Sequence, residues 1–258
     1  MENEIIFSIL IPFVGTILGA ACIYLIKKMN DKLLQAFSGF ASGVMVAASI
    51  FSLIIPSLET ANKGKLSFIP VIIGLWLGFL FLMLLDKIIP HMHTNSDDPE
   101  GLKANLKKST MTSLAVALHN LPEGIAVGVV LASSQGNNAA VTITMAVALA
   151  IGIAVQNFPE GAIVSVSLNS CGVNKHKSFL FGVLSGAVEP IAALITMLLI
   201  NLIHPALPYL LSFAAGAMLY VVVEELIPEM SQGKHSHLGT IFFSLGFSLM
   251  LILETLLG

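Results

Sequence analysis

Residues 114–131 read LAVALHNLPEGIAVGVVL, and residues 151–168 read IGIAVQNFPEGAIVSVSL. Each stretch is apolar except near its centre, where an amide, a proline and a carboxylate follow one another in the same order. A charged side chain in hydrocarbon is costly, roughly 2.5–3.5 kcal/mol on insertion scales. Two such interruptions at matching offsets indicate a polar pathway through a membrane.

The chain as a whole is too apolar for a soluble domain. Of its 258 residues, 56% are hydrophobic and 10% are charged, and its mean hydropathy is +0.91. Soluble domains average about 25% charged residues. The net charge of −3 argues against a nucleic-acid partner. We therefore expect an integral membrane protein whose surroundings are the lipid bilayer. Cys22 and Cys171 fall in different segments, so no disulfide framework is expected.

Eight stretches are long enough to cross the hydrocarbon core, which takes about 20 apolar residues in a helix. Together they predict an all-α polytopic membrane protein with one transmembrane domain over residues 1–258 and a loop at about 90–108. The predicted spans are 5–26, 33–58, 66–89, 109–134, 139–170, 178–203, 205–228 and 238–257.

The distribution of lysine predicts the orientation. With an even number of spans both termini lie on one side, and with the N-terminus outside only Lys63 and Lys65 fall on the outer side. Lysine is enriched in cytoplasmic loops, so this orientation is the expected one. It places both termini outside the cytoplasm in the cell (inner or plasma) membrane. The inner lysines are Lys27, Lys28, Lys32, Lys87, Lys103, Lys107, Lys108, Lys175, Lys177 and Lys234.

Two of the predicted inner loops contain a pair of closely spaced histidines. His91 and His93 lie in the 90–108 loop, and His235 and His237 lie in the last inner connection. They either capture metal transiently or are ordinary solvated loop residues, and the second interpretation is favoured because His is common in loops.

A weaker repeat suggests internal symmetry. FASGVM at 40–45 resembles FAAGAM at 213–218, and Pro56 and Pro228 follow near the expected helix ends. The two spans run in opposite directions, so the first three and last three spans form inverted repeats around the fourth and fifth, in a 3+2+3 arrangement. Inverted repeats with interrupted helices are typical of secondary transporters. The alternative is chance recurrence of small residues, which are common in membrane helices.

The duplicated motif places several polar groups at membrane depth. His119 and Glu123 are four residues apart and share one helix face, with Asn120 on the neighbouring face. Pro122 cannot pair with the carbonyl of Leu118, which must then find a cavity, water or an ion. Gly124 allows another backbone to approach closely. The second copy repeats this pattern with Gln156, Asn157, Pro159, Glu160 and Gly161.

This combination of side chains suits a divalent cation. One imidazole with carboxylates and carboxamide oxygens is a donor set for Zn²⁺, Fe²⁺ or Mn²⁺. A cation between Glu123 and Glu160 would remove their mutual repulsion. We expect two inequivalent metal positions bridged by these two carboxylates. The alternative is a pair of proline-kinked helices joined by amide hydrogen bonds, which does not explain why the residues recur at fixed offsets.

Further polar residues lie in the predicted spans. Glu189, directly before Pro190, is either a metal ligand or a structural hydrogen-bond acceptor. Glu225 is a candidate ligand at the inner exit, and Glu224 is either a ligand or an interfacial residue. Met45 by itself is a packing residue in an apolar helix.

HNLPEG at 119–124 and NFPEG at 157–161 resemble the signature of the ZIP (Zrt/Irt-like) divalent metal transporters. SGAVEP at 185–190 and the segment 215–228 are similar to the prokaryotic GufA-like and ZupT-like branch. Within this pattern, Gln156 and Glu224 stand where some relatives have His.

The resemblance implies a binuclear metal centre within the transport path, and it adds Met45 to the ligands. It implies uptake of Zn²⁺, and in various members of Fe²⁺, Mn²⁺ or Cd²⁺, toward the cytosol. An elevator-like movement of the first, fourth, fifth and sixth spans and a homodimer are also implied. The implied ligands are Met45, His119, Asn120, Glu123, Gln156, Asn157, Glu160 and Glu189.

The predicted function is therefore transport of divalent transition metals and not catalysis. An intramembrane metal-dependent hydrolase would use similar ligands to activate water. However, one of the seven histidines falls at membrane depth and the chain has no HExxH motif. A passive metal channel is the second alternative, and the sequence does not separate it from a carrier.

Overall fold

The computed structural model describes residues 2–26, 28–61, 64–92, 101–102, 107–135, 141–200, 206–234 and 236–258. Within these ranges, eight helical segments are long and apolar enough to cross a membrane, which confirms the predicted all-α class and the number of spans. The segments are Glu2–Tyr24, Asp31–Thr60, Gly64–Ile88, Ser113–Ser134, Ile143–Ser170, Lys175–Leu199, Leu207–Met230 and Leu238–Leu257.

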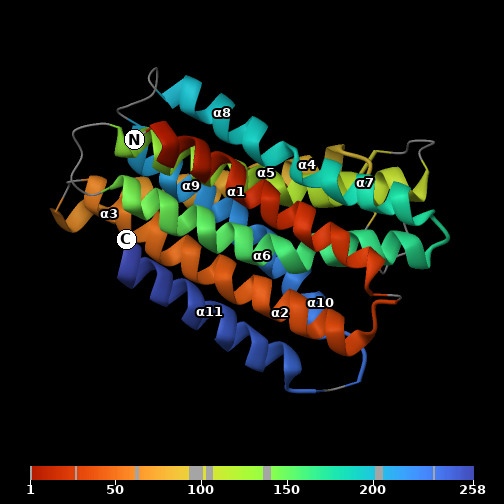
Figure 1. Cartoon of the computed structure of the whole chain (residues 1–258). Helices are drawn as coiled ribbons and strands as arrows, with labels where there is room; N and C mark the ends of the chain where they lie inside the picture. Colours follow the sequence, from red (N-terminus) through yellow and green to blue (C-terminus); the bar gives the residue numbers. More distant parts are fainter. Residues whose placement is uncertain are drawn as a thin grey trace.

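Several of these spans contain more than one helix (Figure 1). Asn30, Thr142 and Asn174 cap α2, α6 and α7 by accepting a hydrogen bond from a first-turn N–H. The α-helices are α1 (Glu2–Ala21), α2 (Asp31–Ala48), α3 (Ile55–Thr60), α4 (Phe68–Ile88), α5 (Lys108–Ser134), α6 (Ile143–Ser170), α7 (Lys175–Gly186), α8 (Val188–Ile200), α9 (Leu207–Val221), α10 (Ile227–Met230) and α11 (Leu238–Leu257).

Two spans contain a π-helical segment directly before a proline. Ser49–Ile54 joins α2 to α3, which contains Pro56, and Val222–Leu226 joins α9 to α10, which contains Pro228. Proline lacks the N–H that a regular helix needs, and a π turn changes the pairing at that point. The helices were expected to end near these prolines, but they continue beyond them to Thr60 and Met230.

The helices pack in two groups. In the first group, α6 packs against α1 and α7, and α5 packs against α8. In the second group, α2 packs against α11, and α9 packs against α4. The groups meet where α6 contacts α2 and where α5 contacts α9. Figure 1 shows α6 lying between α1 and α2 on one face of the bundle.

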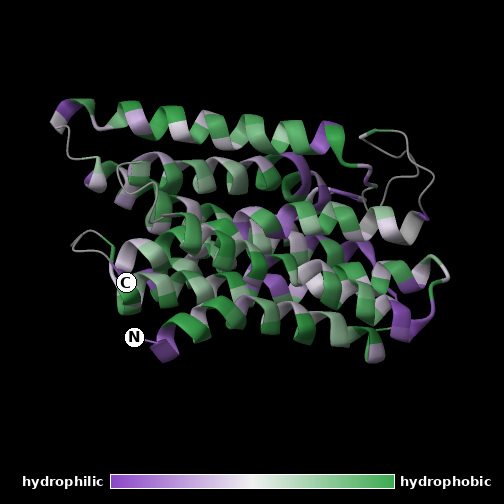
Figure 2. Ribbon diagram, turned by 90° about the horizontal axis from the view of Figure 1, so that it is seen from above, coloured by the Kyte–Doolittle hydropathy of each residue, from purple (hydrophilic) through white to green (hydrophobic). Residues whose placement is uncertain are grey.

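Hydrophobic residues cover most of the helix length, and hydrophilic residues lie mainly toward the helix ends, with a few within the middle of the bundle (Figure 2). The outer faces carry large exposed apolar side chains, such as Trp76, Leu80 and Leu84 on α4. Such faces are stable only against hydrocarbon, so the eight helices form a multi-pass membrane protein.

Candidate metal centre

The duplicated motif lies in the middle of α5 and α6, which pack against each other. Both helices continue through their internal prolines, Pro122 and Pro159. The glycine that ends each copy allows a neighbouring helix to approach closely, as predicted. A Cβ atom at Gly124 would overlap the carbonyl oxygen of Glu189, and one at Gly161 would overlap that of Thr16. The motif is therefore in direct contact with α8 and α1.

Glu189 is positioned by a break between α7 and α8. Pro190 cannot pair with the carbonyl of Gly186, four residues earlier, and α7 ends at that residue. Glu189 then falls in the first turn of α8, where unpaired N–H groups favour negative charge. Its Oε1 accepts a hydrogen bond from Thr16 Oγ1 at 3.2 Å, and its Oε2 accepts one from Asn157 Nδ2 at 2.7 Å. The carboxylate thus joins α8 to α1 and α6.

The amide side chains of the motif donate their N–H groups to the protein. Gln156 Nε2 donates to Glu123 Oε1, and both side chains are fully buried. Asn120 Nδ2 donates to the carbonyl of Ser185 at 3.0 Å. Asn157 Nδ2 also approaches the carbonyl of Pro12, at 3.3 Å. These contacts fix each amide with its oxygen turned away from the donated bond.

Four buried oxygens of the motif are left without a hydrogen-bond partner among the described residues. Their side chains are at most 2% exposed. A buried acceptor without a partner costs roughly 1–3 kcal/mol. Oxygen atoms of this kind are ligands for a cation, which would remove that cost. The four atoms are Asn120 Oδ1, Glu123 Oε2, Gln156 Oε1 and Asn157 Oδ1.

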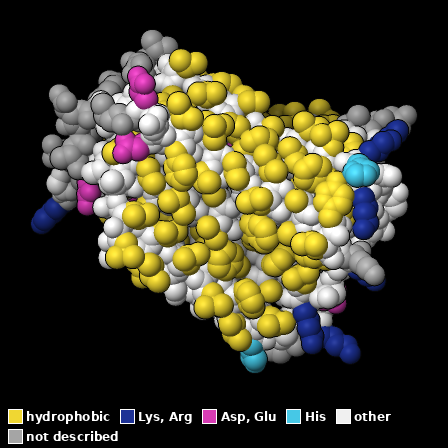
Figure 3. All heavy atoms as spheres, viewed as in Figure 1, with side chains coloured by type: hydrophobic (Ala, Val, Ile, Leu, Met, Phe, Trp, Pro, Cys, Tyr) yellow, Lys and Arg dark blue, Asp and Glu magenta, His cyan; other side chains and the backbone are white. Residues whose placement is uncertain are grey.

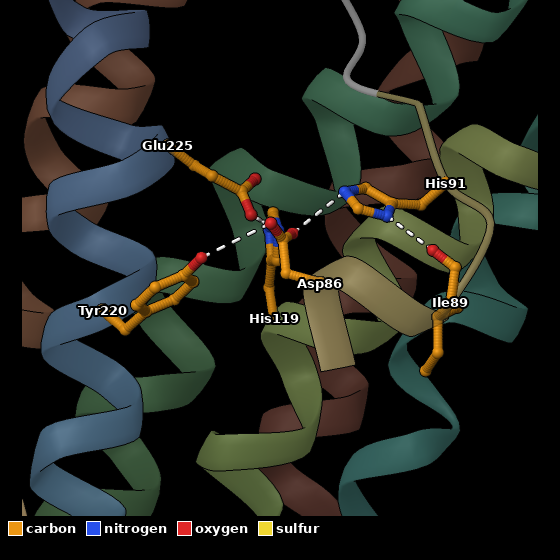
Figure 4. A network of polar contacts seen from close by, with 6 residues as sticks. All are labelled: Asp86, Ile89, His91, His119, Tyr220 and Glu225. Carbon is orange, nitrogen blue, oxygen red and sulfur yellow. Dashed lines mark hydrogen bonds and ion pairs between the residues drawn. The ribbon is translucent and has the colours of Figure 1, made fainter. Parts of the chain in front are cut away.

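His119 and Glu160 belong to a second cluster beside these oxygens. With Glu225 and Glu229 they line a small cavity of about 30 Å³ between α5, α6 and the end of the seventh span. His119 Nε2 forms an ion pair with Glu225 Oε1 (Figure 4). Ser38 Oγ donates to Glu229 Oε2 at 2.8 Å and holds that carboxylate from α2.

Electrostatic interactions connect the two clusters. Glu160 and Glu189 lie close enough to Glu123 for the carboxylates to repel one another when ionised. Glu160 is also attracted to His119. Within the described part of the chain, no three His, Cys, Asp or Glu side chains are close enough together to hold a metal ion by themselves. The predicted ligands are thus divided between an amide-rich oxygen cluster and a cluster that contains the imidazole.

The remaining predicted residues take different places. Met45 is fully buried in the apolar core, in one cluster with Leu149 and Ile153 of α6. Glu224 is exposed, whereas its neighbour Glu225 faces the small cavity. The two carboxylates therefore point in different directions. The sequence had left open whether Glu224 is a ligand or an interfacial residue.

His91 differs from the expectation of a solvated loop residue. Its side chain is 1% exposed. Its Nδ1 contacts the carbonyl of Ile89 at 2.8 Å, and its Nε2 contacts Asp86 Oδ1 at 3.0 Å. Tyr220 donates to Asp86 Oδ2 at 3.4 Å, so the three side chains form a network beside His119 and Glu225 (Figure 4).

His237 is exposed. His93 and His235 lie outside the described residues.

Sequence reasoning missed several residues of the site, chiefly Thr16, Asp86, Tyr220 and Glu229. A hydroxyl such as that of Thr16 in an apolar helix carries no pattern, and Asp86 beside Lys87 resembles an ordinary interfacial pair. Glu229 did carry a signal, because Pro228-Glu229 repeats the proline and glutamate of both motif copies.

The chain is similar to known proteins over nearly its whole length. A family model described as "ZIP Zinc transporter" matches residues 4–110 and 108–254. Human zinc transporter ZIP11 is 33% identical, and the match covers 94% of each chain. Zinc transporter GufA of Myxococcus xanthus is 34% identical over 95% of each chain. Zinc transporter ZupT of Clostridium perfringens is 29% identical over 92% of this chain and 91% of the relative.

Proposed function

The chain belongs to the ZIP zinc transporter family, and we propose that it carries divalent transition-metal ions across the membrane into the cytoplasm. Zn²⁺ is the first candidate, because the relatives are named as zinc transporters. Fe²⁺, Mn²⁺ and Cd²⁺ are further candidates, because an oxygen-rich donor set with one imidazole does not restrict a site to zinc.

One observation carries this proposal. Four buried oxygens of the duplicated motif have no hydrogen-bond partner among the described residues, although they lie in the middle of two membrane-spanning helices. A purely structural pair of polar helices would satisfy these atoms with each other's N–H groups. In a site that binds a cation in place of water and later releases the cation, these oxygens would serve as ligands.

The proposed centre holds two ions bridged by Glu123 and Glu160. Gln156 and His119 complete one position, and His119 reaches it by leaving its ion pair with Glu225. The other position is completed by the remaining predicted ligands, Asn120, Asn157 and Glu189. Glu225 then accepts the ion at the inner end of the path. Met45 stays a proposed ligand that rests on the family resemblance.

The proposed movement is an elevator-type shift of α1 and α5–α8 against the other helices. The division of helix packing supports it, because the most extensive contacts are those of α6 with α1 and α5 with α8 on one side and of α2 with α11 and α4 with α9 on the other. The paired π-helical segments before Pro56 and Pro228 support the inverted 3+2+3 arrangement. We further propose a single transporter domain, a homodimer, and a cell-membrane location with both termini outside.

The rival functions predict different behaviour. The relatives are transporters and not enzymes, and no hydrolase is proposed for this chain. A passive channel would conduct without saturation at low metal concentration, whereas a carrier saturates. The same flux measurement therefore separates carrier from channel.

Uptake into proteoliposomes tests the proposal, with Zn²⁺ as the main ion and Fe²⁺, Mn²⁺ and Cd²⁺ as competitors. We expect saturable uptake that falls roughly 10–100-fold in Glu123→Gln and in His119→Ala, because each removes a ligand or its charge. Glu254→Gln is the matched control, because Glu254 is another carboxylate of a membrane helix but bonds to Ser52 of the second span. Uptake no greater than in empty liposomes would overturn the proposal.

A further inference from the structure

An apolar groove lies between α1 and α2 on the outside of the bundle. Both helices pack against α6, whose surface forms the floor of the groove between them. The groove has a volume of about 620 Å³. Figure 1 shows the arrangement, with α6 visible between the two walls. Among the lining residues are Phe7 and Leu18 of α1, Phe37 and Phe40 of α2, Phe158 of α6 and Phe242 of α11.

The lining of this groove admits hydrocarbon and little else. Every described residue that lines it is apolar, so a polar ligand would find no hydrogen-bond partner there. Figure 3 shows hydrophobic side chains across this face of the molecule. From Phe7 to Leu18 the groove extends about 16 Å along α1. This is about half of the roughly 30 Å hydrocarbon core, which is the depth filled by one acyl chain of one leaflet.

Positive charge lies at one end of the groove. The connection between α1 and α2 crosses that end and carries Lys28, and Lys32 follows in the first turn of α2. Both lysines are exposed. The carboxylate of Asp31, which lies between them in sequence, is turned toward Gly233 of the α10–α11 connection. Phe37 is about 7–8 Å from Lys32 along the helix axis, which is close to the thickness of a headgroup layer.

We propose that this groove is a lipid site, which binds one acyl chain of an anionic phospholipid whose headgroup lies at Lys28 and Lys32. The length and apolar lining select the acyl chain, and the two lysines select the negative headgroup. The lipid comes from the leaflet on the lysine-rich side. Its chain would lie against Phe158 and Pro159, which belong to the second copy of the duplicated motif, and would fill the space between the two helix groups. The site does not depend on the proposed function.

The single tryptophan of the chain provides a matched control for testing this site. Trp76 is 60% exposed on α4, which packs against α9 and lines no part of the groove. It therefore reports ordinary lipid around the protein. A reporter for the groove is made by Phe158→Trp in a Trp76→Phe background, since Phe158 is 40% exposed in the groove. Phe242→Trp in the same background is a second reporter, in case the first disturbs the motif.

The measurement is tryptophan quenching in phosphatidylcholine vesicles that contain increasing fractions of phosphatidylglycerol with brominated acyl chains. We expect both groove reporters to be half-quenched at a mole fraction of brominated lipid at least about fivefold lower than that for Trp76. Each lysine near the membrane surface attracts an anionic lipid by about 1 kcal/mol, and the contribution of one lysine already corresponds to about fivefold in affinity. Lys28→Ala with Lys32→Ala is expected to remove this difference. Val14→Phe, which fills the groove from α1, is expected to weaken quenching of the groove reporter.

Three results would overturn the proposal. Groove reporters that follow Trp76 at every mole fraction would show ordinary lipid contact. In a parallel series the brominated chains are carried by phosphatidylcholine, and equal quenching of the groove reporters by the two lipids would show that the groove does not select an anionic headgroup. Groove reporters that are not quenched by either lipid would show that a second copy of the chain, or another protein segment, covers the groove.

Discussion

At the scale of single residues, the site depends on how each amide and carboxylate is oriented. Asn157 donates its N–H to Glu189, and Gln156 donates to Glu123, so each bond leaves an amide oxygen for another partner. This is the opposite of a satisfied structural network, in which both ends of each amide are paired. The amides and carboxylates of the motif thus leave oxygen atoms available to a further partner.

Thr16 supports this arrangement from outside the motif. Replacing Thr16 by Val removes the hydroxyl that donates to Glu189 and leaves a side chain of similar shape. A hydrogen bond to a charged group contributes roughly 1.5–3 kcal/mol, so we expect the metal concentration for half-maximal uptake to rise about tenfold. Uptake kinetics in proteoliposomes measure this value. Thr144→Val, at an exposed position of α6, serves as the control, and an unchanged half-maximal concentration in Thr16→Val would contradict the role of Thr16.

Glu225 and Glu224 provide a matched pair at the inner end of the proposed path. Glu225 contacts His119 and lines the small cavity, whereas Glu224 is exposed. We expect Glu225→Gln to lower the maximal rate of uptake roughly tenfold and Glu224→Gln to leave it unchanged. Initial rates at saturating Zn²⁺ provide the comparison. Equal effects of the two substitutions would mean that the ion does not pass Glu225.

Much of the candidate site could be predicted from the sequence, because most of its proposed ligands lie in one duplicated local pattern. The division into two clusters could not be predicted, since it depends on His119 turning toward Glu225, more than one hundred residues away in the chain. Thr16 was missed for the same reason, because its contact with Glu189 depends on how α1 and α8 pack. Glu229 was missed although the sequence contained the Pro-Glu pair that identifies it.

At the scale of the elements, prolines adjust the helices in three different ways. Pro122 and Pro159 lie within continuous helices, Pro56 and Pro228 follow π-helical segments, and Pro190 follows a one-residue break at Ala187 between α7 and α8. The sequence identifies where each interruption falls, because proline removes a defined hydrogen bond. It does not determine which of the three outcomes follows, because neighbouring helices decide how the freed carbonyl is satisfied.

The break before Pro190 has a testable consequence. Pro190→Ala restores the missing N–H and lets α7 and α8 join into one helix, which would move Glu189 away from Thr16 and Asn157. We expect uptake to fall at least about tenfold, while the thermal unfolding temperature in detergent stays the same or rises. Pro208→Ala is the control, because a proline in the first turn of α9 lies where no N–H is needed. Normal uptake by Pro190→Ala would show that the break does not position Glu189.

At the scale of the whole molecule, the span count followed from the number and length of the apolar stretches, because membrane crossing requires long apolar segments whatever their partners. The sequence did not predict how the helices associate in two groups. Helix contacts in membranes depend on small residues and close backbone approach, and these residues occur on many helix faces.

The orientation of the molecule can be measured with its own cysteines. Cys171 is exposed at the end of α6, close to Lys175 and Lys177 on the lysine-rich side. We expect a membrane-impermeant maleimide to label it in permeabilised cells but not in intact cells, because lysine-rich connections face the cytoplasm.

Glu59→Cys, with both native cysteines changed to serine, is the control for the opposite side. Glu59 is exposed at the other end of the second span, and the introduced thiol is expected to react in intact cells. Labelling of Cys171 in intact cells would show that the orientation is opposite to the predicted one.

The central claim is that the duplicated motif is a metal site at membrane depth, and the most direct test is calorimetric titration of the purified protein with Zn²⁺. The proposed centre predicts two ions bound per chain, with loss of both in the Glu123→Gln variant, because this carboxylate bridges the two positions. The Glu254→Gln variant is expected to bind as the native chain does. Undiminished zinc binding by the Glu123→Gln variant would contradict the account.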